Sequence, residues 1–138
     1  MAYIFPSDEW ILALKDKLNT DEQYAHIARK WEGDILFDIR ADGPLESPET
    51  YYIDLWHGKC REISIVEPDR AAEAQAAYTL SAPYTILTRV LKGDLDPMQA
   101  MITRKLTVHG SMAYMLRNVP VVLDFVRCAQ EITTEILE

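Results

Sequence analysis

The stretch 51-YYIDLWHGKCREISIVE-67 alternates between apolar and polar side chains over most of its length. A period of two is typical of strands that bury only one face of a sheet. The turn-forming run His57-Gly58-Lys59 divides the stretch and predicts a hairpin. Since 34-DILFDIRA-41 has the same period, we expect three strands of an antiparallel meander.

The residues before the meander have the period of a helix instead. Apolar residues recur every three or four positions behind Ser7 and two acidic residues, a pattern that predicts a helix capped by Ser7. Thr20 and Gln23 match the capping-box pattern and predict the start of a second, short helix that stops near Gly33. The chain is therefore expected to open with a helical pair.

The segment after the meander has an ambiguous pattern. Alanines in 70-RAAEAQAAYTLS-81 favour a helix, whereas the apolar residues at its end could pair with the sheet. We assign residues 75–81 to a fourth strand. Alternation in 105-KLTVHG-110 predicts a fifth.

Two further helix starts lie between these strands. Ser81 followed by Pro83 predicts the first, which should end at Lys92-Gly93. Asp96-Pro97 places a capping carboxylate before a proline at the first helical position, so a second helix should follow at once.

The last third of the chain predicts a long helical region. Ser111 is a good cap, Pro120 should interrupt or restart the helix, and an apolar stripe continues to Ile136. Helices, strands and helices are thus largely segregated along the chain. This order predicts a single α+β domain over residues 1–138, with helices packed on one face of a five-stranded antiparallel sheet.

Composition excludes several classes of protein. The 138 residues include 22 acidic and 14 basic side chains, a formal net charge of −8. A nucleic-acid partner is not expected, because phosphates need a positive surface. Steady docking on an anionic membrane is disfavoured for the same reason. No signal peptide and no apolar run of membrane-spanning length is visible. We therefore expect a cytoplasmic protein without stable membrane insertion.

The residue types that carry catalysis are sparse. The three histidines show no metal-ligand spacing, and the five glycines form no phosphate-binding loop. Capping explains Asp96 in 93-GDLDP-97. Cys60 and Cys128 share no metal-ligand or CxxC spacing, so each is expected to be a small buried apolar residue, with a disulfide between them as the alternative. We therefore predict no enzyme, no cofactor and no metal. An enzymatic alternative would require His109 or Asp54 inside a pocket.

Methionines are concentrated in one segment. Met98, Met101, Met112 and Met115 lie within nineteen residues, and the only other methionine is Met1. Thioether side chains adapt to several apolar shapes. The segment could therefore contact a hydrophobic ligand, or it could fill gaps in an ordinary core.

The chain resembles the sterol carrier protein 2 (SCP-2) family over nearly its whole length, as a stand-alone domain. The likeness is clearest from Leu91-Lys92-Gly93 through Asp96-Pro97 to 105-KLTVHGS-111. It also includes Trp31-Glu32-Gly33 and 52-YIDL-55. Arg104 stands where family members usually have glycine, and Ser111 where aspartate is common.

The resemblance implies an apolar cavity between sheet and helices, and noncatalytic binding or transfer of fatty acids, acyl-CoAs, phospholipids or sterols. Nothing in the residues indicates selectivity for steroids. We expect one wall of the cavity to come from the methionine segment and its neighbours on the flanking helices, although each could instead be plain core. The candidate lipid-binding residues are Ile86, Leu87, Val90, Met98, Met101, Ile102, Met112, Met115, Leu116, Val122 and Phe125.

A second function remains open from the sequence. The same domain could act as an accessory or scaffold protein, holding a hydrophobic or isoprenoid intermediate for partner enzymes, or forming a homodimer.

Overall fold

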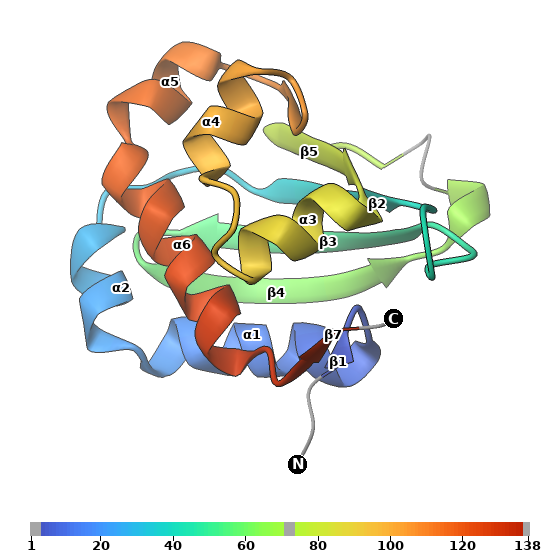
Figure 1. Ribbon diagram of the computed structural model, residues 1–138. Coiled ribbons are helices and arrows are strands. Elements are labelled where there is room, and N and C mark those ends of the chain that lie inside the picture. The colour runs from blue at the N-terminus through green and yellow to red at the C-terminus, as the bar shows by residue number, and fades with distance from the viewer. Residues whose placement is uncertain (1–3, 71–73, 137–138) are drawn as a thin grey trace.

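A computed structural model describes residues 4–70 and 74–136 of the chain, and Figure 1 shows their arrangement. The main sheet has five strands in the order β4-β3-β2-β5-β6. Their bounds are β2 (Ile35–Arg40), β3 (Glu49–Trp56), β4 (Lys59–Val66), β5 (Tyr78–Pro83) and β6 (Thr107–His109). All five strands lie where the sequence predicts them, with boundaries shifted by one to three residues.

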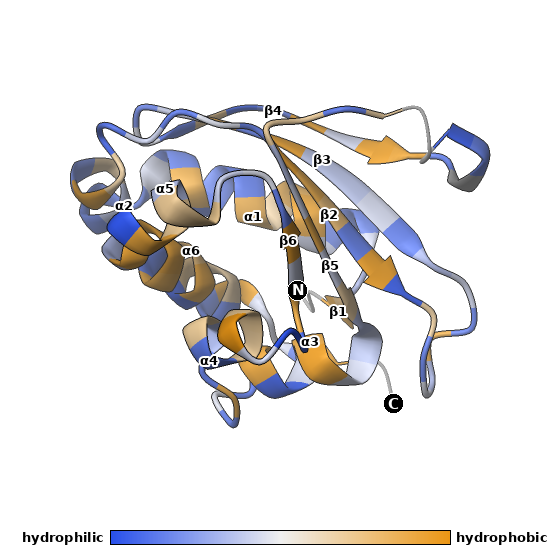
Figure 2. Ribbon diagram, turned by 90° about the horizontal axis from the view of Figure 1, so that it is seen from above, coloured by the Kyte–Doolittle hydropathy of each residue, from blue (hydrophilic) through white to orange (hydrophobic). Residues whose placement is uncertain are grey.

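The helices are α1 (Asp8–Thr20), α2 (Glu22–Ile27), α3 (Tyr84–Leu91), α4 (Pro97–Ile102), α5 (Met112–Arg117) and α6 (Val119–Ile132). A short 3-10 turn, η1 (Pro68–Arg70), follows β4. Figure 2 shows the helices together on one side of the sheet. The predicted α+β class and the one-sided cover are therefore confirmed.

The prediction of a purely antiparallel sheet is wrong, because the sheet is mixed. The meander β2-β3-β4 is antiparallel as expected, and β5 and β6 are antiparallel to each other. However, β5 lies parallel to β2, with Ile35 opposite Tyr78 and Ile39 opposite Ala82. β4 and β5 follow each other in the sequence but lie on opposite sides of the β3–β2 pair in the sheet. Alternation specifies which face a side chain takes, but it contains no information about strand direction.

The β3–β4 hairpin has the predicted turn. His57 and Gly58 both adopt positive φ angles, 48° and 81°, as a two-residue hairpin turn that matches strand twist requires. A Cβ on Gly58 would come within 2.6 Å of the Ala25 carbonyl oxygen. Glycine at this position therefore lets the hairpin approach α2.

Three of the predicted helix caps are confirmed. Ser7, Asp96 and Ser111 each accept hydrogen bonds from backbone N–H groups in the first turn of α1, α4 and α5. The predicted capping box at Thr20 and Gln23 is wrong, since the carboxylate of Asp21 caps α2 and the Thr20 hydroxyl donates back to the Asp16 carbonyl.

The predicted helix start at Ser81 is also wrong. Ser81 belongs to β5, and its hydroxyl donates to Asp38 on the neighbouring strand. α3 begins three residues later, behind Pro83. A hydroxyl next to a proline suits a cap, but pairing with β2 extends the strand through this position.

The C-terminal apolar stripe does not form one continuous helix. α5 ends at Arg117 and α6 restarts with Pro120 in its first turn, as predicted. α6 then ends at Ile132, and Glu135–Ile136 forms β7, which pairs in parallel with β1 (Ile4–Phe5). The two ends of the described chain are thereby held together beside α1 (Figure 1).

An ionic network joins the opening helices to α6. The Arg127 guanidinium lies 2.6 Å from Asp21 and 2.8 Å from Asp124. Lys17 lies 3.1 Å from Asp21 and 2.9 Å from Glu131. Since α1 and α2 both pack against α6, this network helps to fix how the helices close over the sheet.

Candidate functional site

An apolar cavity of about 80 Å³ lies between the sheet and the helices. Strands β2, β3 and β5 form its floor, and α3, α4 and α6 form its roof. Every side chain in its wall is apolar. The wall consists of Phe5, Trp10, Ile35, Phe37, Ile53, Leu80, Leu87, Val90, Leu91, Pro97, Met101, Leu106, Val122, Phe125, Val126 and Ala129.

A second apolar cavity of about 30 Å³ adjoins the first, toward α5. Trp31, Leu55, Met115 and Val121 line only this second space. The side chains that belong to both walls are Ile35, Leu80, Met101, Val122 and Phe125. These five shared side chains therefore separate the two cavities.

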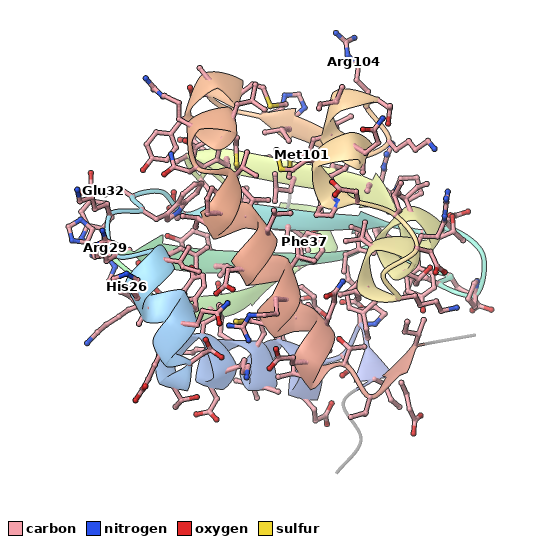
Figure 3. The ribbon with its side chains drawn as sticks, turned by 60° about the vertical axis from the view of Figure 1, so that its left-hand side comes forward. His26, Arg29, Glu32, Phe37, Met101 and Arg104 are labelled. Atoms are coloured by element: carbon pink, nitrogen blue, oxygen red, sulfur yellow. The ribbon has the colours of Figure 1, made fainter. Side chains whose placement is uncertain are left out.

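Six of the eleven predicted side chains line this space. Leu87, Val90, Met101, Val122 and Phe125 line the first cavity, and Met115 lines the second together with three of them. Figure 3 shows Met101 of α4 and Phe37 of β2 on the side of the sheet that α6 covers. Two of the four clustered methionines therefore face the cavities.

The other five predicted residues do not line either cavity. Ile86, Met98 and Met112 are half-buried against the core, whereas Ile102 and Leu116 are 64% and 50% exposed. α4 explains the split, because residues one position apart on a helix lie about 100° apart. When Met101 points inward, Ile102 points away from the core.

Sequence reasoning missed the floor and one end of the cavity. The strand residues Ile35, Phe37, Ile53 and Leu80 line it, and so do Phe5 and Trp10. The strand residues carry a usable signal, since they are the inward members of the alternating pattern. Phe5 carries none, because its position depends on the pairing of β1 with β7.

The groups that an enzymatic mechanism would need lie elsewhere. Asp54 pairs with Arg61 at 3.0 Å and His109 is exposed at the end of β6. Neither lines one of the two apolar cavities. His57 contacts the Glu32 carboxylate at 2.6 Å, but both side chains are half exposed to solvent. The apolar wall can therefore hold a ligand but offers no proton-transfer group.

Cys60 and Cys128 are buried, as expected, and both are free thiols rather than a disulfide. Burial raises the pKa of each thiol to about 11. Thiolate formation at neutral pH is therefore suppressed, and both cysteines act as small apolar residues.

One group of possible metal ligands is already satisfied by protein cations. Ligand atoms of Asp21, Asp124 and Cys128 lie within 4.8 Å of one another. The Arg127 guanidinium occupies that position and bonds both carboxylates. These hydrogen bonds lower the pKa of the Asp21 carboxyl far below its ordinary value, and Arg127 supplies the largest share.

With this geometry in place, comparison with known proteins identifies the family. The sequence pattern of the SCP-2 sterol transfer family matches residues 11–122. The chain belongs to this family. None of the curated proteins compared with it is a significant match.

Solved structures of SCP-2 proteins share the fold. A crystal structure of sterol carrier protein 2 is 29% identical, with a TM-score of 0.82 over 92% of this chain and 98% of that one. A solution structure of a conserved hypothetical protein from Thermus thermophilus, possibly a sterol carrier protein, is also 29% identical, with a TM-score of 0.80 over 92% and 88%. Sterol carrier protein 2 from Aedes aegypti, in complex with the C16 fatty acid palmitate, is 20% identical, with a TM-score of 0.54 over 88% and 94%.

The structure shows how Ser111 and Arg104, the two departures from the family pattern, are accommodated. Ser111 caps α5 as an aspartate would. Arg104 adopts a φ of 62° in the turn after α4, a conformation that glycine adopts at little cost.

Within the described ranges, no helix has both the length and the apolar character needed to cross a bilayer.

Proposed function

We propose that this protein binds a lipid noncatalytically, with the apolar chain of the lipid in the cavity under α6, and that it transfers such lipids. The entirely apolar wall carries the proposal. Each methylene group removed from water contributes about 0.8 kcal/mol, so ten methylenes contribute about 8 kcal/mol before the costs of ordering. No polar side chain in the wall opposes that gain.

The size of the cavity implies that the ligand-bound form is wider. Pockets for molecules of moderate size span about 300–1,000 Å³, whereas the larger of the two apolar cavities is about 80 Å³. Met101 lies in the walls of both cavities, and its unbranched side chain adapts readily. α4, which contains Met101, is a helix of six residues. We therefore infer that an outward shift of α4 with rotation of Met101 enlarges the space.

Family membership and one ligand-bound relative support the same class of ligand. The Aedes aegypti protein holds palmitate, but at 20% identity that likeness shows the fold alone. We therefore propose a long acyl or isoprenoid chain as the ligand, and we assign no headgroup.

A pair of adjacent α6 variants tests the proposal. Val122 lines both cavities, whereas its neighbour Leu123 is 41% exposed. Val122→Phe should fill the space and weaken binding of a fluorescent fatty acid by at least about tenfold, at a folding cost of about 1–3 kcal/mol. Leu123→Phe adds an aromatic ring outside the cavity and should bind as the wild type does.

Two readouts decide the result. Circular dichroism must show that both variants are folded at the assay temperature, and native mass spectrometry with solvent extraction must show whether lipid copurifies. Equal affinity of the two variants, or no uptake of any acyl or isoprenoid probe by the wild type, would contradict a lipid in this cavity.

The scaffold function is the second candidate. Apolar side chains outside the cavity walls remain exposed at Leu12 on α1, Trp56 on β3 and Ile65 on β4. Such residues suit a homodimer or a partner enzyme that receives a held isoprenoid intermediate. Light scattering across a range of protein concentrations tests the homodimer directly, and a mass that stays at one chain removes it.

A further inference from the structure

Charge is distributed unevenly along this acidic chain. Residues 97–118 contain no aspartate or glutamate, although the whole chain has 22 such residues. The same segment contains Arg104, Lys105 and Arg117. The segment therefore has a formal charge of +3 (three cations, no carboxylate) in a protein whose net charge is −8, and the exposed Asp94 and Asp96 directly precede it.

The segment forms one end of the folded molecule. It comprises α4, β6 and α5, which Figure 1 shows at the end opposite α1. Arg104 points away from the body of the protein (Figure 3), and Lys105 and Arg117 are also exposed. We call residues 97–118 the α4–α5 surface.

Large apolar side chains protrude beside these cations. Ile102 is 64% exposed two residues before Arg104, and Leu116 is 50% exposed next to Arg117. Exposed apolar side chains flanked by arginine and lysine are typical of surfaces that bind at the boundary between lipid headgroups and acyl chains. The apolar groups enter the boundary while the cations contact anionic headgroups.

The same two short helices also reach the cavities. Met101 and Met115 line them from α4 and α5, and each immediately precedes one of the exposed apolar residues in the sequence. A small rotation or outward shift of α4 would therefore open the cavity at the surface where Ile102 protrudes.

We propose that the α4–α5 surface docks transiently on anionic lipid bilayers and that the lipid ligand enters and leaves the cavity past α4. The route for the ligand rests on the proposed lipid-binding function, whereas the docking does not. The net charge, which disfavours steady docking, averages over the whole molecule. Electrostatic interactions are screened within about 8 Å at physiological ionic strength, so the acidic groups around α1 act only weakly at the opposite end. Asp96 lies at the start of α4, where its carboxylate accepts hydrogen bonds from the Met98 and Gln99 N–H groups.

Vesicle binding tests the docking. The wild type should bind vesicles of equal parts phosphatidylcholine and phosphatidylglycerol, bind pure phosphatidylcholine far less, and release with added salt. Each cation near an anionic surface contributes about fivefold in affinity. Arg104→Gln/Lys105→Gln should therefore bind the anionic vesicles about 25-fold more weakly. Ile102→Ser, an exposed change, should also weaken vesicle binding.

A matched control separates local from net charge. Arg40 and Arg70 are exposed on β2 and η1, so Arg40→Gln/Arg70→Gln makes the same change in net charge elsewhere. It should bind anionic vesicles as the wild type does. If the control loses as much affinity as Arg104→Gln/Lys105→Gln, the location of the docking surface is wrong.

A fluorescent fatty acid in vesicle-free solution separates this proposal from the lipid-binding function. Wild-type uptake of the probe without affinity for anionic vesicles overturns the docking and leaves the function intact. Vesicle binding without uptake of the probe supports the docking and contradicts the function. Normal uptake by Arg104→Gln/Lys105→Gln, with weakened vesicle binding and slower transfer of the probe from vesicles to protein, supports both.

Discussion

Arg104 shows how one residue can depart from a family pattern at a measurable cost. Its φ of 62° lies in the left-handed region, which costs a non-glycine residue about 1–2 kcal/mol. We expect Arg104→Gly to stabilise the protein by about 1 kcal/mol. Glycine removes the backbone strain, but its greater conformational freedom in the unfolded chain offsets part of that stabilisation. Urea denaturation measures the change in the free energy of unfolding.

Lys105→Gly is the control at the next position. Among the described non-glycine residues, only His57 and Arg104 have positive φ, so glycine at position 105 removes no strain and should destabilise. If both variants destabilise equally, the left-handed backbone at Arg104 is not the cause.

The residue scale also shows the limits of local patterns. Ser7, Asp96 and Ser111 were predictable as caps, because capping depends on the next three residues alone. Ser81 matched the same type of pattern but lies in a strand, where its hydroxyl donates to Asp38 across the sheet. A contact between residues 43 positions apart decided its conformation, and no local pattern contains that contact.

At the scale of elements, Arg127 of α6 holds the N-cap of α2 through the Asp21 carboxylate and also bonds Asp124 on its own helix. It donates to Asp21 at 2.6 Å and to Asp124 at 2.8 Å, and the Asp124 side chain is only 5% exposed. Arg127→Met should leave both acids without this partner. Arg127 itself is 28% exposed, so solvent compensates in part and we expect a loss of about 2 kcal/mol at pH 7, less than for a fully buried pair.

The pH dependence of this loss has a defined sign. Arg127 holds the pKa of Asp21 below its ordinary value of 3.8, so the stabilisation is complete above about pH 5 and is lost as the pH falls from 3.8 toward the folded-state pKa. The difference in unfolding free energy between wild type and Arg127→Met should therefore shrink between about pH 7 and pH 3. Arg40→Met, at an exposed arginine, should cost little at either pH, and a pH-independent loss at Arg127 would contradict the ion-pair account.

For the whole molecule, the α+β class and the helix-covered sheet could be predicted, because periods of 2 and about 3.6 directly report which faces are buried. The parallel pairing of β5 with β2 could not, since alternation does not specify which strand β5 pairs with or in which direction. The residues that line the cavity also divide into predictable and unpredictable ones. Its inward helix residues, such as Leu87 and Phe125, lay on a visible apolar stripe. The contribution of Phe5 required knowledge of where the two ends of the chain meet.

The small volume of the cavity leads to a prediction about movement. β2 and β3 are held in register by five paired positions, whereas α4 has six residues. A bound acyl chain should therefore displace α4 rather than the sheet. Spin labels at Thr103→Cys, after α4, and Ser64→Cys, on β4, should move apart by about 2 Å when the protein binds fatty acid.

The native thiols should not react with the spin label, because burial raises the pKa of Cys60 and Cys128 to about 11. Labels at Arg40→Cys and Ser64→Cys, both on the main sheet, supply the control pair, whose separation should not change. An unchanged distance between positions 103 and 64, with ligand bound, would mean that side-chain rotation alone enlarges the space. In that case the lipid would not enter by displacing α4, and the proposed route past Ile102 would be wrong.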